Sequence, residues 1–526
     1  MKINLYIKCN FTFIKALLVI VSLLISFVND AQEPSLVWMK TFGGGGDELI
    51  QKNITRTQDG GFIINIVTSA AANTGSIDSF CSFTNKRSIF IKYNSDASVI
   101  EWNKCFGFGA DSNFNYIFPG SDGNFLLGGS FNGYVDNGWI VTKQDAVGNT
   151  LWQHNYGKGS GYILDDMLPM KDGTYILLGK NNRTDTNALT HYGAWDAMDF
   201  LVMKIDSNGN KMWSKVIGGT GDEQMGDLVA APGNGFYIVG SSSSNDHDCT
   251  GNHGEYDVYV ARLNDTGGII WTNSLGGSSV DAAYNACSNG MGGVIITGFT
   301  KSTDFDVHHH GALNDVDFWT LEVDSSNTLV WENCHGTNSF WEKANSVCKA
   351  SDGSIWISGY SFSNGDDVYI VHTDSVGNQL QSSVFGSNKT DGGSILHPLP
   401  SGMIFSGGYF SANNGAFSST QNYGGYDVFI SVFAPWGANI KYIYDNNFFK
   451  LYPNPVKNIL NIELNNTHSD LVLFISDAIG RRLYSTQISS YTKEIGIDIS
   501  NIPKGTFYVN IIDGNSNNYV KTVEIK

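Results

Sequence analysis

The chain has 526 residues, which exceeds one ordinary hydrophobic core and indicates several domains or one large repeat array. Gly is abundant at 60 residues, aromatic residues reach 13% and charged residues only 16%, a composition typical of an all-β protein rather than a disordered one. The formal net charge of −18 argues against a nucleic-acid partner, since phosphate binding needs clustered Lys and Arg.

Residues 1–31 have the pattern of a signal peptide. Lys2, Lys8 and Lys15 precede an apolar run at 16–27, and Ala31 marks the expected cleavage point. The run is too short for a spanning helix, and no later segment has the character of one. We therefore expect an exported mature chain without a transmembrane segment.

Six cysteines remain after this cleavage, an even number that permits disulfides in an exported chain. Cys334 and Cys348 fall in consecutive predicted strands, so the sequence favours them as one candidate pair. The cysteines and histidines lack zinc-ligand spacing, and we expect neither a metal nor a cofactor.

A degenerate phrase recurs along most of the chain: Asp, a short apolar strand, a turn, Trp and then Gly-Gly. Its clearest copies lie at 199–219 and 257–277. The aspartates that lead these strands are separated by 58, 60, 50 and 60 residues, which indicates true repetition. They are Asp199, Asp257, Asp317, Asp367 and Asp427, and the tryptophans are Trp38, Trp102, Trp152, Trp213, Trp271 and Trp331.

A second hairpin motif occurs seven times between residues 58 and 408, which gives seven units of about four strands. Small sheets of this kind bury their faces by stacking radially, so we expect a seven-bladed β-propeller over 32–440. The Asp strand and the Trp strand are predicted as the third and outermost strands of each blade. The tryptophans would then pack between blades.

The last copy has an Asp strand at 427–433, whereas the first copy has only a Trp strand at 36–42. We expect these two strands to pair and close the ring, with 439–444 as the rival partner. The repeat resembles bacterial β-propeller families of secreted proteins at Asp257, Arg262, Gly267, Trp271 and Gly276-Gly277. That resemblance implies an architecture and no single activity.

The repeat ends before residue 440, and a different pattern of short apolar strands follows it. We expect a linker at 441–449 and an Ig-like β-sandwich of short strands at 450–526. This stretch resembles the type A C-terminal sorting domain of the type IX secretion system, at Tyr452, Pro453, Asn454, Pro455, Gly480 and Gly505 among other positions. The resemblance implies the type IX machinery as a partner, and a mature protein that is secreted or attached to the outer cell surface.

Acidic residues follow the Gly-Gly pairs and would recur on one face near the channel: Asp47, Asp111, Asp222, Asp281 and Asp391. Converging carboxylates could hold Ca²⁺ or meet a cationic or sugar ligand. The simpler interpretation, which we favour, is that each Asp closes a turn onto its own backbone. Histidines 308–310 with Asp304 and Asp306 could bind a metal, but adjacent loop residues seldom point at one centre.

Loop residues before the Asp strands, including His191, His253, Tyr192, Trp195, Tyr256, Asn422, Tyr423 and Tyr426, suit either a binding rim or packing between loops. The array contains only four arginines and no hydrolase signature. The sequence therefore favours non-catalytic binding of an extracellular glycan or protein over two alternatives, a polysaccharide hydrolase or lyase and a structural surface component. Carboxylates and arginines in one pocket would favour the enzyme.

Overall fold

The structure, a computed structural model, describes residues 36–526 with several gaps. The internal ranges outside the description are 52–53, 58, 69–86, 107–111, 121, 133–136, 146–148, 158–162, 182–191, 194–196, 309–314, 338–340, 363–364, 419–421, 434–440, 444–447, 465–470, 477–481, 490–491, 501, 503 and 513–516. The predicted signal peptide at 1–31 also lies outside the described residues.

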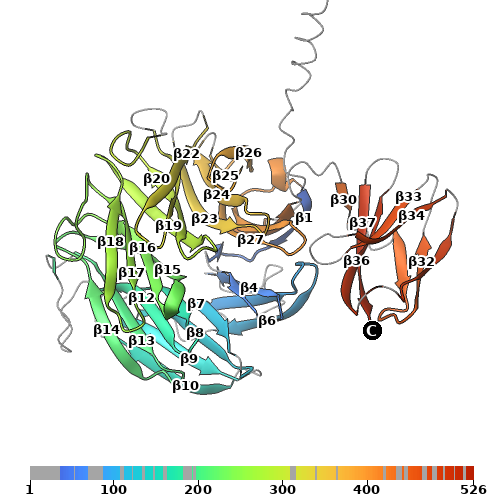
Figure 1. The fold of residues 1–526 in the computed structure, drawn as a ribbon, viewed down its shortest axis with the longest axis horizontal. Helices are drawn as coiled ribbons and strands as arrows, with labels where there is room; N and C mark the ends of the chain where they lie inside the picture. The colour runs from blue at the N-terminus through green and yellow to red at the C-terminus, as the bar shows by residue number, and fades with distance from the viewer. Residues whose placement is uncertain are drawn as a thin grey trace, which may run out of the picture.

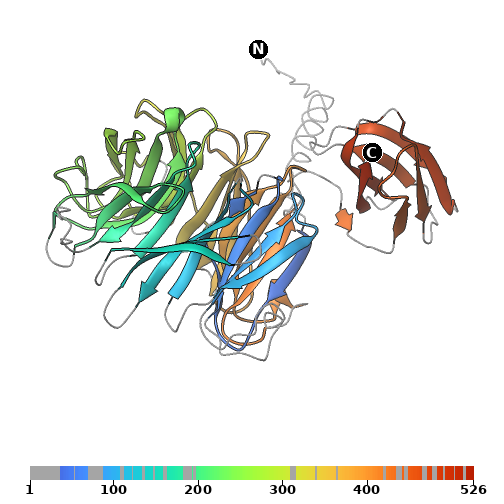
Figure 2. The same cartoon turned by 90° about the horizontal axis from the view of Figure 1, so that it is seen from below.

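The described residues up to 433 form seven antiparallel sheets that follow one another around a common centre, a propeller-like arrangement (Figures 1 and 2). The first three sheets contain β2–β6 (Glu48–Ile50, Thr55–Arg56, Phe62–Thr68, Arg87–Tyr93, Ile100–Phe106), β7–β10 (Ser112–Pro119, Phe125–Asn132, Asn137–Gln144, Thr150–Tyr156) and β11–β14 (Ile163–Pro169, Tyr175–Asn181, Asp199–Ile205, Lys211–Ile217).

The next three sheets contain β15–β18 (Glu223–Ala230, Phe236–Ser242, Asp257–Leu263, Ile269–Leu275), β19–β22 (Asp281–Ser288, Val294–Thr300, Asp317–Val323, Leu329–His335) and β23–β26 (Glu342–Lys349, Ile355–Phe362, Asp366–Thr373, Gln379–Phe385). The last contains β27–β29 (Gly392–Pro398, Ile404–Phe410, Asp427–Phe433) and β1 (Leu36–Phe42). Two single-turn 3₁₀ helices occur, at Pro232–Asn234 and Gly415–Phe417. The described part of the chain contains no helix of the length and apolarity needed to cross a membrane.

Each Asp-led strand is the third strand of its sheet, as predicted, and the fourth strand carries the Trp except in β26, where Gln381 stands in its place. All seven residues of β13 are buried, whereas β14 is partly exposed along most of its length, as an edge strand should be. The turn between them is fixed by Asp206, whose Oδ1 accepts hydrogen bonds from the backbone N–H groups of Asn208 and Asn210. Gly209 has a φ of 82°, which a residue with a Cβ rarely adopts.

The hydrophobic core lies between neighbouring sheets rather than within any one of them. One cluster joins Phe200 and Val202 of β13 to Ile238 and Tyr259 of the next sheet, and all four side chains are fully buried. An isolated four-stranded sheet would expose both of its faces to water. The apolar surface buried between neighbouring sheets therefore supplies most of the stabilisation.

The two ends of the array meet in one sheet. β1 pairs antiparallel with β29, with Met39 opposite Ser431, so the predicted closing pair is confirmed. The rival segment lies elsewhere: β30 (Lys441–Ile443) pairs parallel with β37 (Asn517–Ile525) near the C-terminus. The backbone groups of β30 are thus used in a different sheet, and it is not the closing strand.

A belt of side-chain hydrogen bonds links the first strands of successive sheets. In each sheet concerned, a side chain at the β-bulge of the first strand accepts a hydrogen bond from a backbone N–H in the first strand of the following sheet. The pairs are Asp166 with Leu228 (2.8 Å), Asp227 with Ala286 (2.7 Å), Asn285 with Val347 (3.0 Å) and Ser346 with Leu396 (3.1 Å). The belt satisfies backbone groups that the bulges leave without a ladder partner.

The C-terminal strands form two sheets of their own (Figure 1). β31 (Phe449–Tyr452), β32 (Ile459–Leu464) and β35 (Glu494–Asp498) make one; β30, β37, β36 (Gly505–Ile512), β33 (Leu471–Ser476) and β34 (Arg482–Ile488) make the other. Their facing side chains form one buried cluster that includes Leu460, Ile462, Leu473 and Val509. Residues 441–449, expected as a linker, contribute β30 and the first residue of β31.

The predicted Cys334–Cys348 disulfide is wrong. Both cysteines are free, and they belong to different hydrophobic clusters. β22 and β23 follow each other in the chain, but β22 is the last strand of one sheet and β23 is the first strand of the next. Consecutive strands of a repeat are therefore not spatial neighbours at this step. Cys105, which was not singled out, is disulfide-bonded.

Candidate ligand-binding site

The recurring tryptophans lie at contacts between sheets and not in an open row. Trp213 stacks on Phe236 of the next sheet, with ring centroids 6.4 Å apart. A Cβ on Gly267, in the Asp-Gly turn of that next sheet, would lie 3.1 Å from the Trp213 ring. Trp152 and Trp331 lie in the same way against Gly209 and Gly377.

The other three tryptophans make related contacts. Trp102 lies edge-on to Phe125 of the next sheet, and Trp271 donates its indole N–H to the backbone oxygen of Ser325 (3.2 Å), also in the next sheet. Trp38 differs, because its ring neighbour Phe405 belongs to its own sheet. In each case the ring is half-buried, which leaves little aromatic surface for a ligand.

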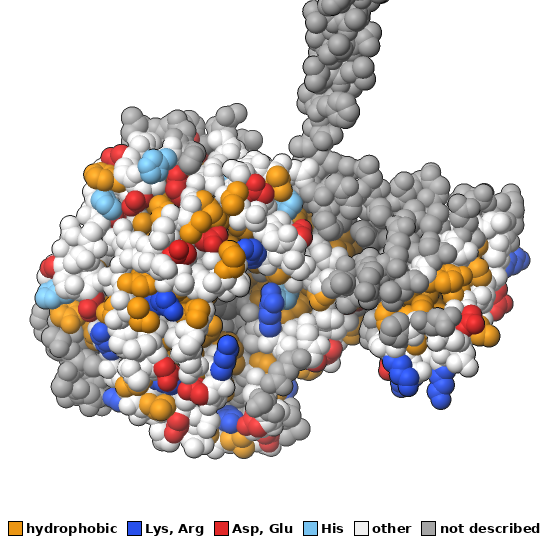
Figure 3. Space-filling view, viewed as in Figure 1, with side chains coloured by type: hydrophobic (Ala, Val, Ile, Leu, Met, Phe, Trp, Pro, Cys, Tyr) orange, Lys and Arg blue, Asp and Glu red, His pale blue; other side chains and the backbone are white. Residues whose placement is uncertain are grey.

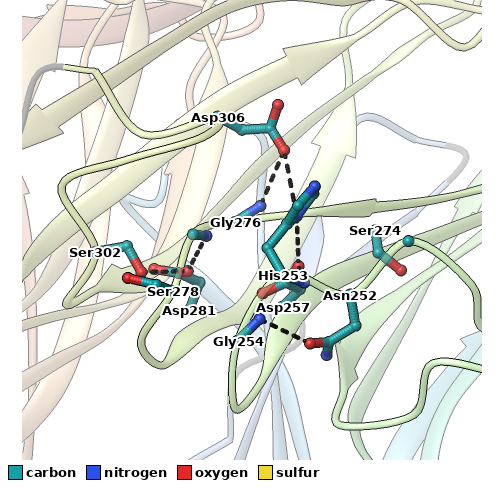
Figure 4. Close-up of polar contacts among 12 residues, drawn as sticks. Asn252, His253, Gly254, Asp257, Ser274, Gly276, Ser278, Asp281, Ser302 and Asp306 are labelled. Atoms are coloured by element: carbon teal, nitrogen blue, oxygen red, sulfur yellow. Dashed lines mark hydrogen bonds and ion pairs between the residues drawn. The ribbon is translucent and has the colours of Figure 1, made fainter.

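The loop acids do not converge on a common ligand position. Asp281 is fully buried and accepts hydrogen bonds from the backbone of Gly277 (2.7 Å) and from the hydroxyls of Thr300 (2.5 Å) and Ser302 (2.8 Å) (Figure 4). Asp391 is equally buried and accepts the backbone N–H of Ser411 (3.0 Å). These two aspartates close turns onto the local backbone.

Two further acids bind the backbone of the loop that precedes an Asp strand. Asp222 accepts the N–H of Met198 (2.9 Å), and Asp47 accepts the N–H of Tyr426 (3.1 Å). Asp111 lies outside the described residues. Asp281 and Asp391 thus match the turn-closing interpretation, whereas Asp222 and Asp47 bind the backbone of a loop that is distant in the sequence.

Sequence reasoning missed the acids that share the position of Asp281 and Asp391. Glu48 and Glu223 are fully buried, and each accepts the backbone N–H of the glycine four residues earlier, at 2.7 and 3.2 Å. Glu342 is buried at the corresponding strand start. The sequence signal is an acidic residue four positions after the second glycine of the Gly-Gly pair. Glu48 and Glu223 occupy that position. The aspartates directly before them, Asp47 and Asp222, were considered in their place.

Each turn-closing acid lies beside the strand-leading Asp of the preceding copy; in the sheets of Glu223, Asp281 and Asp391 a glycine backbone lies close to both carboxyl groups. A Cβ on Gly276 would lie 2.6 Å from Asp257 Oδ1 and 2.7 Å from Asp281 Oδ2, so no larger residue fits. Burial raises the pKa of Asp257 to about 6. In the sheets of Glu223 and Asp427, burial raises the pKa of these carboxyls to about 8 and about 7. When two carboxyl groups lie this close together and are shielded from water, the protonated form of one of them is favoured.

The histidine and aromatic loop positions anchor these aspartates. The backbone N–H and ring Nδ1 of His253 both lie 2.9 Å from Asp257 Oδ2, and Asp306 Oδ2 lies 3.9 Å from the same Nδ1 (Figure 4). Tyr192 and Tyr423 donate backbone N–H groups to Asp199 (3.0 Å) and Asp427 (2.7 Å). The loops therefore pack onto the strand ends; His191, Trp195, His309 and His310 lie outside the described residues.

One acidic group has the spacing of metal ligands. Asp315, Asp317 and Glu342 place one oxygen each within 4.8 Å of one another. Glu342 Oε1, however, already accepts the hydroxyl of Ser361 at 3.0 Å, as turn-closing acids elsewhere do. Asp317 and Glu342 are this copy's strand-leading Asp and turn-closing acid, and Asp315 is an additional acid beside them.

A cavity of about 410 Å³ lies where the first strands of the sheets begin. Its wall combines side-chain amides, phenol rings and one ion pair, drawn from the first strands of different sheets and from residues beside them. Asp165 and Lys180 form the pair, with 3.6 Å between Oδ1 and Nζ. The other lining residues used below are Gln51, Asn115, Tyr284 and Asn345. Cavities with a few convergent polar groups among apolar walls are the usual form of small-ligand sites.

A second cavity, of about 240 Å³, lies where the first strands end. Arg56, Asp166 and Asp227 line it together with His397. Both aspartates accept backbone N–H groups of the belt described above. Burial lowers the pKa of His397 to about 3, so this imidazole is neutral near neutral pH. Arg262 lies elsewhere and donates Nη1 to the Ser325 backbone oxygen (2.7 Å).

The predicted sorting residues at 452–455 lie in a segment that is hydrogen-bonded to β35 and to the last strand, β37. The Tyr452 hydroxyl donates to Glu494 Oε1 (2.5 Å), and Asn454 Oδ1 accepts the backbone N–H of Glu524 (2.8 Å). Gly505 begins β36 with a φ of 145°. Gly480 lies outside the described residues.

Comparison with known families decides the nature of this segment, because residues 450–526 match the model of the secretion system C-terminal sorting domain. The chain ends in a type IX sorting domain. The protein is therefore secreted or attached to the outer cell surface, and the sorting domain implies the secretion machinery as a partner.

No curated protein matches the sequence. Three of the solved structures that match it resemble it distantly. A protein of unknown function from Dyadobacter fermentans is 10% identical with a TM-score of 0.37, over 76% of this chain and 98% of that one. A polysaccharide lyase, an ulvan lyase, is 8% identical with a TM-score of 0.41, over 70% and 93%. A puromycin hydrolase is 11% identical with a TM-score of 0.40, over 72% and 50%. Similarities this weak assign no activity.

Proposed function

We propose that this secreted protein binds an extracellular glycan, without catalysis, in the cavity where the first strands begin. The observation that carries the proposal is the wall of this cavity, where amides of Gln51, Asn115 and Asn345 and the ring of Tyr284 come from separate sheets. Amides donate and accept hydrogen bonds with sugar hydroxyls, and an aromatic ring covers the apolar face of a sugar. The cavity wall belongs to strands, which position its side chains rigidly.

A glycan array probed with the mature protein tests this proposal, with a double variant Gln51→Ala and Asn115→Ala. We expect the variant to bind at least about tenfold more weakly, since hydrogen bonds lost from a buried polar site cost roughly 1–3 kcal/mol. Arg56→Ala, at the other end of the first strands, is the matched control and should bind as the natural protein does. Unchanged binding by the double variant, or no binding to any glycan, would contradict the proposal.

The proposal includes an architecture. The seven sheets would be the blades of one closed propeller within 32–440, with the tryptophans holding adjacent blades together, and 450–526 would be an Ig-like sandwich. The sheet order and the β1–β29 pairing support this. An experimental structure with another number of blades would overturn it.

The alternative is a polysaccharide hydrolase or lyase. It is favoured by Arg56, Asp166 and Asp227, which share the second cavity. The belt hydrogen bonds of both aspartates speak against it, because a carboxylate that holds backbone N–H groups is a poor proton acceptor. Incubation with a polysaccharide panel distinguishes the two: new reducing ends or unsaturated sugars, lost in Asp227→Asn, would establish the enzyme.

A further inference from the structure

An exposed tryptophan with two lysines lies beside the cavity just described. Trp341 is 45% exposed, in contrast to the half-buried tryptophans of the repeat. The ammonium groups of Lys301 and Lys343 lie 5.2 and 5.3 Å from the centroid of its ring. Two cations thus lie close to one exposed aromatic ring. Lys and Arg side chains are visible around the middle of the face seen in Figure 3.

These lysines stand out in a chain of net charge −18. Neither forms an ion pair with a described carboxylate, and the stretches 309–314 and 338–340, which are not described, contain no Asp or Glu. Several other buried or half-buried lysines form ion pairs, as Lys204 does with Asp172 and Asp265. The pKa of Lys343 is lowered, first by burial and then by the charge of Lys301. Two cations that repel each other, and that no described carboxylate neutralises, are stabilised by an anion placed between them.

The cluster is continuous with the cavity. Tyr284, which lines the cavity, packs against Phe299 with ring centroids 5.7 Å apart. The Lys343 ammonium lies 4.5 Å from the Phe299 centroid, and the Lys343 strand also carries the lining residue Asn345. An extended ligand could therefore occupy the cavity with one unit and reach Trp341 with another.

We propose that Lys301, Lys343 and Trp341 form a subsite for the anionic group of an acidic polysaccharide, either a carboxylate or a sulfate ester. This inference rests on the proposed glycan binding and specifies its ligand class. The ammonium groups would pair with the anion, and the Trp341 face would contact the sugar ring that carries it. The chemistry of the two lysines accepts both kinds of anion, so the experiment must separate them.

The test measures affinity of the full mature chain for polygalacturonate, which carries carboxylates, for dextran sulfate, which carries sulfates, and for unmodified dextran and xylan. We expect at least one acidic polymer to bind more tightly than the neutral ones. The double variant Lys301→Gln and Lys343→Gln should weaken that binding by about tenfold or more, because hydrogen bonds to charged groups are worth roughly 1.5–3 kcal/mol. Lys171→Gln with Lys211→Gln, which removes the same charge from the sheets elsewhere, should change it little.

The outcomes separate the two proposals. If the Lys301 and Lys343 variant binds acidic polymers as the natural protein does, or if only neutral polymers bind, the anionic subsite is wrong and the cavity proposal stands. If that variant loses binding while Gln51→Ala with Asn115→Ala keeps it, the subsite is supported and the cavity is not where the glycan binds. If only dextran sulfate binds more tightly than the neutral polymers, the anion is a sulfate ester. If only polygalacturonate does so, the anion is a carboxylate.

Discussion

Glu223 illustrates how the repeat uses carboxylates at the scale of single residues. Burial raises the pKa of its carboxyl from 4.5 to about 8, although the hydroxyls of Ser242 and Ser244 lower that pKa; the neighbouring Asp199 adds a smaller increase. The folded state thus prefers a protonated Glu223, whereas the unfolded chain ionises it near 4.5. The stability that this group contributes is complete below pH 4.5 and is lost as the pH rises through about 8.

Glu223→Gln should therefore flatten the pH dependence of stability. Thermal unfolding midpoints of the natural protein should fall as the pH rises from 4.5 towards about 8, and those of the variant should fall less, because the amide has no proton to lose. Glu255→Gln, an exposed glutamate, is the control. Parallel midpoint curves for the natural protein and Glu223→Gln would show that Glu223 is ionised in the folded state.

Sequence alone favoured Asp281 and Asp391 as turn-closing residues because no copy of the repeat has the dense acidic spacing of a Ca²⁺-binding loop. It could not identify their partners, the strand-leading aspartates, because the paired residues belong to different copies of the repeat. The cavity residues were equally hidden. Gln51, Asn115 and Asn345 are ordinary polar residues in sequence, and only the convergence of strands from separate sheets gives them a shared function.

Strands were more predictable than residues. The positions of the Asp strand and the Trp strand followed from their spacing and from the Gly turn between them, because a short turn forces its two strands to pair. The disulfide prediction failed at a step without a short turn, from the last strand of a sheet to the first strand of the next.

The β1–β29 register can be tested by a cross-strand disulfide. Met39 stands opposite Ser431, so Met39→Cys with Ser431→Cys should oxidise readily and join the two ends of the array. We expect stabilisation of about 2–4 kcal/mol relative to the reduced form, because the crosslink restricts the unfolded chain.

The control pairs Met39→Cys with Ile430→Cys. Neighbouring residues of a strand point to opposite faces, so this pair should stay reduced. Mobility on non-reducing gels and thermal unfolding report both results. A disulfide in the control but not in the first pair would show that the register is shifted by one residue.

At the scale of the molecule, the C-terminal strands and the sheet array have separate hydrophobic clusters. Deletion of 450–526 should therefore leave the array folded, with an unchanged unfolding midpoint, while the protein no longer reaches the cell surface or the medium. Cell fractionation and immunoblotting measure the location. Normal export of the truncated chain would mean that the sorting information lies elsewhere.

The β1–β29 pairing has a consequence for the order of assembly. Strand β29 needs residues from the very start of the array, so its sheet stays incomplete until the chain has been synthesised through Phe433. Until then β1 has an unsatisfied edge that is available to wrong partners. The array can therefore be completed only shortly before the sorting domain is synthesised. A chain that carries the sorting domain thus also carries every strand that the array needs.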